Sequence, residues 1–173
     1  MKKSLNFMRL LFVSATVMTL TLATISCTQK DKKKEFDKVA ATQAIEKENQ
    51  IFTEAFNKGD SIAATNGYAS DAKFMPPNQK AVSGRANIQT AIAGFIKAGA
   101  SGLTIKPIEV WGDENMLTVE EEWSMTDKEG KEIDRGKSLE LWKMEEGKWK
   151  LFRDIFNSDL PCPPPPPTPS PSK

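Results

Sequence analysis

The chain has 173 residues, and its 24 Lys and Arg nearly balance its 23 Asp and Glu, so we expect one modest domain without a nucleic-acid partner. It contains no histidine, which excludes Ser-His-Asp hydrolysis, His-Asp dehydration and His-ligated zinc. The two cysteines, Cys27 and Cys162, lie near the ends, so the region between them holds no cysteine nucleophile.

The N-terminal residues have the layout of a secretory signal peptide. Three basic residues precede an apolar run over 10–25, which is short for a membrane-spanning helix. The segment TISC, Thr24–Cys27, resembles the lipobox of bacterial lipoproteins, in which the cysteine is acylated. The alternative is cleavage by the general signal peptidase, with Cys27 unmodified. We expect a signal peptide over 1–26 and a lipid anchor at Cys27, which holds the protein to the periplasmic side of the bacterial outer membrane.

Two polar segments flank the central region. Residues 27–35 are rich in lysine and poor in apolar side chains, which predicts a charged tether. Residues 160–173 hold most of the prolines and predict an extended, disordered tail, with a docking motif for a partner as the alternative. If Cys27 is lipidated, Cys162 has no partner for a disulfide within the chain. The expected globular domain is 36–159.

Apolar residues at helical spacing predict three helices in the first half of this domain. The range Asp37–Asn57 has one apolar face and precedes Gly59, a typical helix stop. Asp60 is expected to cap a short second helix that closes at Gly67. The third helix is expected over Arg85–Gly99, where apolar residues recur at i, i+4, i+7 and i+8.

In the second half of the domain, apolar and polar residues alternate, which predicts strands. Leu103 and Ile105 share one face while Ile108 and Val110 share the other, so we expect a bulge or bend at Pro107. Helices followed by a run of antiparallel strands indicate the α+β class. Three turns separate the four expected strands, at 112–115, 127–130 and 145–147.

Several features follow one another in the central domain: a long helix, GD at 59–60, YASDAKFMPP at 68–77, GR at 84–85 and GKWKLFRDIFNSD at 147–159. Their order and spacing resemble the nuclear transport factor 2-like superfamily, in the branch of SnoaL-like and ketosteroid isomerase-like small domains. The resemblance implies a cone-shaped α+β fold in which three N-terminal helices pack in a curved, mainly antiparallel sheet. It also implies two short strands at 73–75 and 81–82, with Tyr68 and Phe74 in the core or the pocket wall.

One carboxyl lies on an apolar strand face. Glu121 shares its face with Val119 and Trp123. On the last strand, Arg153 and Asn157 share a face with three apolar residues. If both faces line the cone, an acid, a guanidinium and an amide point into an apolar cavity, where burial should raise the pKa of Glu121 unless a cation offsets it. The alternatives are a structural pair of Glu121 with Arg153, or a place on the outer face.

Three functions stay open. The first is binding of a small apolar or amphipathic molecule, with Tyr68, Trp123, Arg153 and Asn157 as ligand contacts. The second is an isomerase or cyclase, in which Glu121 moves a proton next to a carbonyl and Tyr68 donates a hydrogen bond to an oxyanion. The third is a structural dimer with a filled cone. No cofactor and no metal are expected.

The last strand also carries apolar residues on its second face. Phe152 and Phe156 alternate there with Asp154. A homodimer through the outer surface of the sheet, which is common in the superfamily that the chain resembles, would cover them.

Overall fold

The structure, a computed structural model, describes residues 36–161. The expected signal peptide over 1–26, the tether with Cys27 and the tail with Cys162 lie outside these residues, apart from the first two positions of the tail. Within the described part, no helix is long and apolar enough to cross a membrane.

Three helices form where the apolar spacing predicts them: α2 (Lys38–Asn57), α3 (Ser61–Thr65) and α4 (Arg85–Lys97). The carboxylate of Asp37 accepts a hydrogen bond from the backbone N–H of Ala40 at 2.9 Å and caps α2. Asp60 caps α3 in the same way, as predicted, through the N–H of Ala63 at 2.9 Å. Gly84 precedes α4 with φ of 83°, a conformation that favours glycine.

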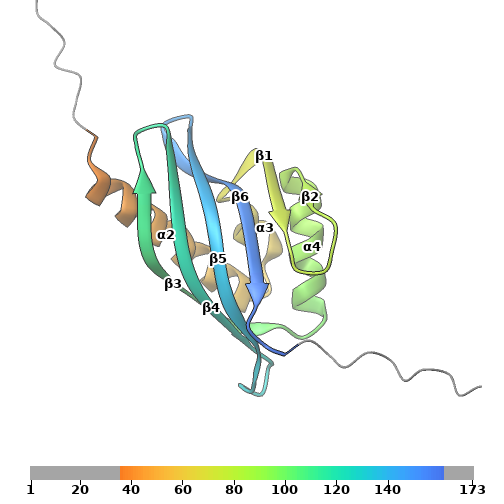
Figure 1. Cartoon of the computed structure of the whole chain (residues 1–173). Coiled ribbons are helices and arrows are strands. Elements are labelled where there is room, and N and C mark those ends of the chain that lie inside the picture. Colours follow the sequence, from red (N-terminus) through yellow and green to blue (C-terminus); the bar gives the residue numbers. More distant parts are fainter. Residues whose placement is uncertain (1–35, 162–173) are drawn as a thin grey trace, which may run out of the picture. The chain divides into compact units, whose positions relative to one another are not determined.

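Six strands form one sheet in the order β2-β1-β6-β5-β4-β3. They are β1 (Tyr68–Met75), β2 (Val82–Ser83), β3 (Ser101–Gly112), β4 (Met116–Thr126), β5 (Glu132–Glu145) and β6 (Lys148–Ser158). All neighbours pair antiparallel except β1 and β6, which are parallel. Figure 1 shows the helices behind the curved sheet, with α2 crossing behind β3 to β5. The predicted α+β class and cone-shaped fold are confirmed.

The loop between α3 and α4 forms the short strands that the resemblance implies. Phe74 pairs with Val82 across β1 and β2. However, β1 begins already at Tyr68, five residues before the expected start, because it also pairs in parallel with β6. Tyr68 and Phe74 are both buried in the core.

The expected bulge in β3 is present. The register shifts between Pro107 and Glu109, so Ile108 is the extra residue and is 47% exposed. Val110 is then buried in the same core as Leu103. The prediction that Val110 shares a face with Ile108 is therefore wrong, because the bulge lies between them.

A bulge in β6 was not predicted. Leu141 of β5 pairs with Arg153, but the next residue, Trp142, pairs with Leu151, so Phe152 is extra. The alternation along β6 changes phase at this point. Beyond the bulge, Asp154 turns inward and Ile155 becomes 49% exposed.

The core lies between the helices and the inner face of the sheet. The helices contribute branched and aromatic residues from their apolar faces, and the central strands contribute the alternating residues of their inner face. Its largest fully buried apolar and aromatic side chains are Ile45, Tyr68, Ile88, Leu117, Val119 and Trp142.

Candidate functional site

A cavity of about 90 Å³ lies inside the cone, between α2, α4 and the sheet. This is room for several water molecules or for part of a small ligand. Most of the lining is apolar, and both helices and four of the strands supply aromatic rings to it. Among these rings are Phe52, Phe56, Phe74, Phe95, Trp142 and Phe156.

Three buried carboxyls lie on neighbouring strands at one side of this cavity. Glu121 of β4, Glu140 of β5 and Asp154 of β6 are 1%, 4% and 7% exposed. Glu140 pairs directly with Asp154, and Glu121 pairs with Ser138, two residues before Glu140. Because residues two apart in a strand share a face, the three carboxyls gather on the inner face. In the described part of the chain, none of them forms an ion pair.

Glu121 is held by two neutral donors. Asn49 Nδ2 of α2 donates to Glu121 Oε1 at 2.5 Å, and Ser138 Oγ donates to Oε2 at 3.3 Å. Burial raises the pKa of Glu121 to about 7; the hydrogen bond from Asn49 opposes this rise and the negative charge of Asp154 adds to it. This carboxyl can therefore gain or lose a proton near neutral pH.

Asp154 is paired with the only tyrosine of the chain. Tyr68 Oη donates to Asp154 Oδ2 at 2.5 Å. Burial raises the pKa of Asp154 to about 6, against the lowering effect of this hydrogen bond. Burial and the charge of Asp154 raise the pKa of Tyr68 well above its usual value, so the phenol keeps its proton and remains a donor.

Glu140 lies between the other two carboxyls. Trp142 Nε1 donates to Glu140 Oε2 at 2.8 Å. Burial raises the pKa of Glu140 well above its usual range, and the charges of Glu121 and Asp154 raise it further. Since like charges this close disfavour each other, the three carboxyls titrate as a group and share their protons.

Trp123 carries an unused donor. The side chain lines the cavity and is 8% exposed, yet its Nε1 has no hydrogen-bond partner. Gly136, its partner on β5, makes room for the ring, because a Cβ there would lie 3.0 Å from Trp123 Cζ2. Among residues 36–161, no group of three or more Asp, Glu, Cys or His side chains is arranged to hold a metal ion.

Of the predicted site residues, Glu121, Tyr68 and Trp123 line the cavity. Arg153 and Asn157 do not, which corrects the expectation that their face of the last strand lines the cone. Arg153 Nη1 instead donates to the carbonyl of Phe152 at 2.7 Å, and its guanidinium stacks 3.5 Å from the centre of that ring. Asn157 Nδ2 donates to Asp159 Oδ1 at 3.1 Å. The physical reason is the bulge at Phe152, which exchanges the two faces of β6 beyond it.

Sequence reasoning missed Asn49, Glu140 and Asp154 as cavity residues. Asn49 lies four residues after Ile45, so helical spacing already places it on the apolar face of α2. Glu140 and Trp142 are two residues apart in β5 and share a face, as Glu121 and Trp123 do in β4. The same argument would therefore have placed Glu140 on the inner face. Asp154 gave no such indication, because the bulge reverses the pattern there.

Residues 50–152 match the family described as SnoaL-like domain. None of the curated proteins matches the chain. Among solved structures, a protein of unknown function with a cystatin-like fold from Nostoc punctiforme has TM-score 0.63 and 16% identity, covering 72% of this chain and 95% of its own. A ketosteroid isomerase-like protein from Erwinia carotovora atroseptica has TM-score 0.59 and 20% identity, covering 69% and 96%. An NTF2-like protein from Novosphingobium aromaticivorans has TM-score 0.60 and 14% identity, covering 68% and 81%. At these identities the structural likeness shows the fold alone.

Proposed function

The chain belongs to the family of SnoaL-like domains, and on that premise we propose that its cone cavity binds a small apolar or amphipathic molecule. The observation that carries the proposal is the cavity itself, which is apolar over most of its lining and polar at one side. A largely apolar, concave site with a few convergent polar groups is the usual form of a small-molecule site.

The aromatic side chains that line the cavity would supply most of the binding energy, because contact with them removes the apolar surface of the ligand from water. The polar side, with Glu121, Asp154 and the N–H of Trp123, would fix the orientation of the ligand. Tyr68 contributes to this side through Asp154, since its hydroxyl already donates to that carboxylate.

Tryptophan fluorescence tests this proposal, because Trp123 and Trp142 both line the cavity. We expect neutral aromatic alcohols to change the emission with saturation. Ile92→Phe, which fills the cavity from α4, should abolish the change. Leu139→Phe, at a position 48% exposed, is the matched control and should leave it intact. Equal binding by the Ile92→Phe variant and the wild type would show that the ligand does not enter the cavity.

A second function, proton transfer next to a carbonyl, is favoured by the pKa of Glu121, which at about 7 suits a general base at neutral pH. The carboxylate would remove a proton from a ligand carbon and return it to another position. Hydrogen–deuterium exchange next to the carbonyl of acetophenone, followed by NMR, tests this. The rate should rise through pH 7 and vanish in Glu121→Gln. Exchange at the solvent rate in the wild type would leave binding as the function.

We further propose that Cys27 is lipidated and anchors the domain to the bacterial outer membrane, on the periplasmic side. The support is the sequence, in which TISC follows an apolar run directly. Mass spectrometry of membrane fractions should find acyl chains on Cys27, and Cys27→Ser should release the protein. A soluble, unmodified wild type would contradict this.

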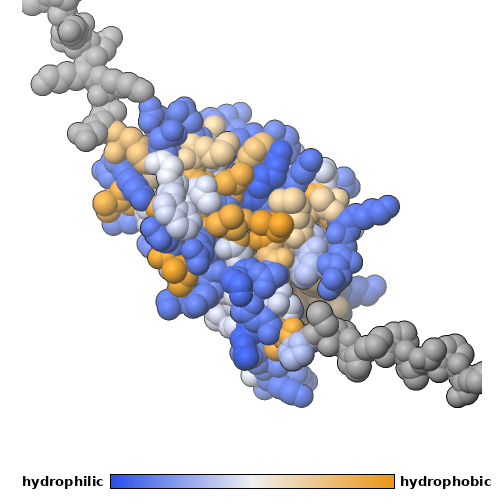
Figure 2. Space-filling model, in the orientation of Figure 1, coloured by the Kyte–Doolittle hydropathy of each residue, from blue (hydrophilic) through white to orange (hydrophobic). Residues whose placement is uncertain are grey.

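A homodimer through the outer face of the sheet is also proposed. The contacts differ from those expected, because Phe156 lies in the cavity and packs against Trp123 with ring centres 5.4 Å apart. Leu139 and Ile155 pair across β5 and β6 and are 48% and 49% exposed. Figure 2, which views the sheet from the side away from α2, has an apolar patch near the middle of this mostly polar face.

A further inference from the structure

The charges around the cavity are all of one sign. Among the described residues that line it, Glu48, Glu121, Glu140 and Asp154 are acids, and no lysine or arginine is present. The three buried carboxyls accept hydrogen bonds from the uncharged side chains of Asn49, Ser138, Tyr68 and Trp142. Glu121 and Glu140 also interact with each other through a hydrogen bond. A buried carboxylate without a cation is costly, and the fold does not supply the compensating charge.

A positively charged ligand would supply it. A cation among the carboxylates gains charge-assisted hydrogen bonds in a largely apolar surrounding, where such bonds are stronger than in bulk water. The aromatic rings around it add a second attraction, since the face of a ring is negative. These rings come from α2, α4 and four strands, so an apolar body and a cationic group can both be accommodated.

We propose that the ligand is an organic cation, a protonated amine on a compact apolar body, whose nitrogen lies among Glu121, Glu140 and Asp154. The inference rests on the proposed binding function and names the chemical class that the cavity selects. Neutral molecules of the same shape bind more weakly, and carboxylic acids are rejected because they would add a further negative charge.

An independent feature of the lining also points to a ligand. The indole N–H of Trp123 is buried without an acceptor, in a side chain 8% exposed, although buried donors are nearly always paired. Trp123 lies on the strand that carries Glu121, two residues away and on the same face. An acceptor oxygen on the ligand, such as a hydroxyl or carbonyl near the amine, would satisfy this donor.

The preference for a cation depends on pH. The titratable groups that face Glu121 are Glu48 from α2, Tyr68 from β1, Glu140 from β5 and Asp154 from β6. With a pKa of about 7, Glu121 is mostly ionised at pH 8 and mostly protonated at pH 5. A cation that needs this carboxylate therefore binds more weakly at pH 5 than at pH 8, because Glu121 is then mostly protonated.

Isothermal titration calorimetry with the purified full chain tests the inference through three probes of one shape: phenethylamine, phenethyl alcohol and phenylacetate. At pH 8 we expect the amine to bind at least about tenfold more tightly than the alcohol, which corresponds to one charge-assisted hydrogen bond. Phenylacetate should not bind. The preference for the amine should disappear at pH 5.

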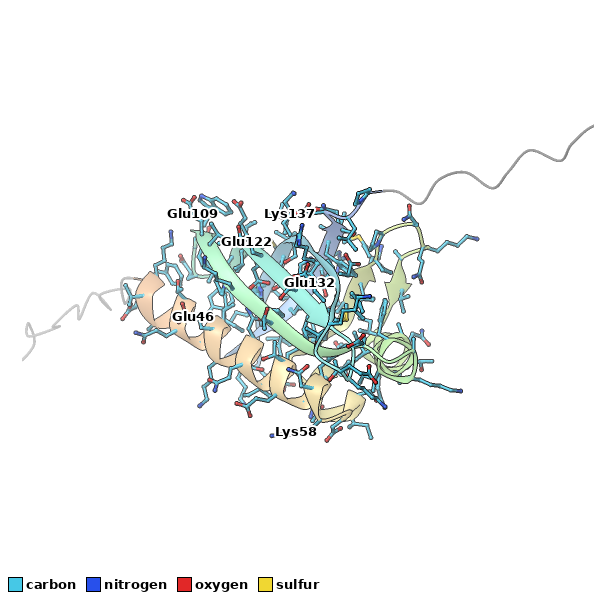
Figure 3. All side chains as sticks on the ribbon, turned by 90° about the horizontal axis from the view of Figure 1, so that it is seen from below. Glu46, Lys58, Glu109, Glu122, Glu132 and Lys137 are labelled. Atoms are coloured by element: carbon cyan, nitrogen blue, oxygen red, sulfur yellow. The ribbon has the colours of Figure 1, made fainter. Side chains whose placement is uncertain are left out.

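Glu121→Gln should abolish the preference while still binding the alcohol, which also shows that the variant is folded. Glu122→Gln is the matched control, because Glu122 is the next residue and faces outward, 3.8 Å from Lys106 (Figure 3). Equal affinity for amine and alcohol would overturn the inference and leave the binding function standing. A preference that survives in Glu121→Gln would also overturn it, whereas no binding of any probe would overturn both proposals.

Discussion

The two faces of the sheet differ in how they expose acidic and apolar side chains. On the inner face, Glu121 is buried without a cation, while its neighbour Glu122 on the outer face is exposed and lies near Lys106. On the outer face, Leu139 is half exposed, while Trp142 on the inner face is 2% exposed. The buried carboxyls of the inner face are the unusual feature, because ionisable side chains are seldom fully buried without a partner charge, whereas a single exposed leucine is ordinary. Such departures from the folding rules are expected where a molecule is built to bind.

The largest expected effect comes from removing an inner aromatic residue. Trp142→Ala should lower the free energy of unfolding by about 3 to 5 kcal/mol, because it opens a cavity. It also leaves Glu140 Oε2 without its donor. Leu139→Ala, on the outer face, should cost less than about 1 kcal/mol. Urea unfolding of both variants measures the contrast, and similar losses would show that the two faces do not differ in packing.

The second prediction concerns pH. Since the folded state raises the pKa of Glu121 from 4.5 to about 7, the folded protein holds this proton more tightly than the unfolded chain. The contribution of Glu121 to the free energy of unfolding is therefore fully present below pH 4.5. This contribution is lost as the pH rises to 7. The loss should be about 3 kcal/mol, because each tenfold difference in proton affinity between the two states corresponds to about 1.4 kcal/mol.

Glu121→Gln should remove the part of the slope that comes from Glu121, leave the part that comes from Glu140 and Asp154, and make the protein more stable than the wild type at pH 8. Glu122→Gln should leave the slope unchanged. Urea midpoints at pH 5 and pH 8 for the three proteins give the comparison. A wild type that becomes more stable between these pH values would contradict the burial of a carboxyl without a cation.

A third, smaller effect is expected at Tyr68. Tyr68→Phe removes the donor to Asp154, so the pKa of Asp154 should rise above about 6. The variant should lose about 2 kcal/mol of stability at pH 8, where the carboxylate is ionised, and less at pH 5. Carbon NMR of the carboxyl and urea unfolding measure the two quantities. An unchanged pKa of Asp154 would show that the hydroxyl does not hold this carboxyl.

The smallest effect on stability is expected on the outer face. Leu139→Ser together with Ile155→Ser should change the free energy of unfolding of the monomer by less than about 1 kcal/mol. The same pair should convert a dimer to a monomer, because it removes the apolar contact. Light scattering at micromolar concentration, with the wild type beside it, distinguishes the cases. A wild type that is already monomeric would leave the outer face without a partner copy.

Most of the fold follows from local patterns in the sequence. The helices have caps such as Asp60 and one apolar face each, and the strands from β3 onward alternate between their bulges. Glu121 was found for the same reason, because β4 alternates without interruption from Leu117 to Met125. Where the pattern is unbroken, a strand face can be assigned from the sequence.

The rest of the site depends on pairing between strands. Nothing in the local sequence around Phe152 marks it as the extra residue of a bulge; only its register against β5 does. The sequence therefore assigned Arg153 to the cavity in place of Asp154. The sharing of protons among three carboxyls was equally beyond reach, since it requires three strands to be placed side by side.

The extra residue in β6 also makes the charge inside the cone insensitive to a change in the length of this strand. Leu151 and Arg153, on either side of the bulge, pair with two consecutive residues of β5, Trp142 and Leu141. A relative that lacked Phe152 would therefore alternate without interruption through Leu151, Arg153 and Asp154, and Asp154 would still point inward. Loss of one codon at this point would thus remove the bulge and leave the three carboxyls inside the cone in place.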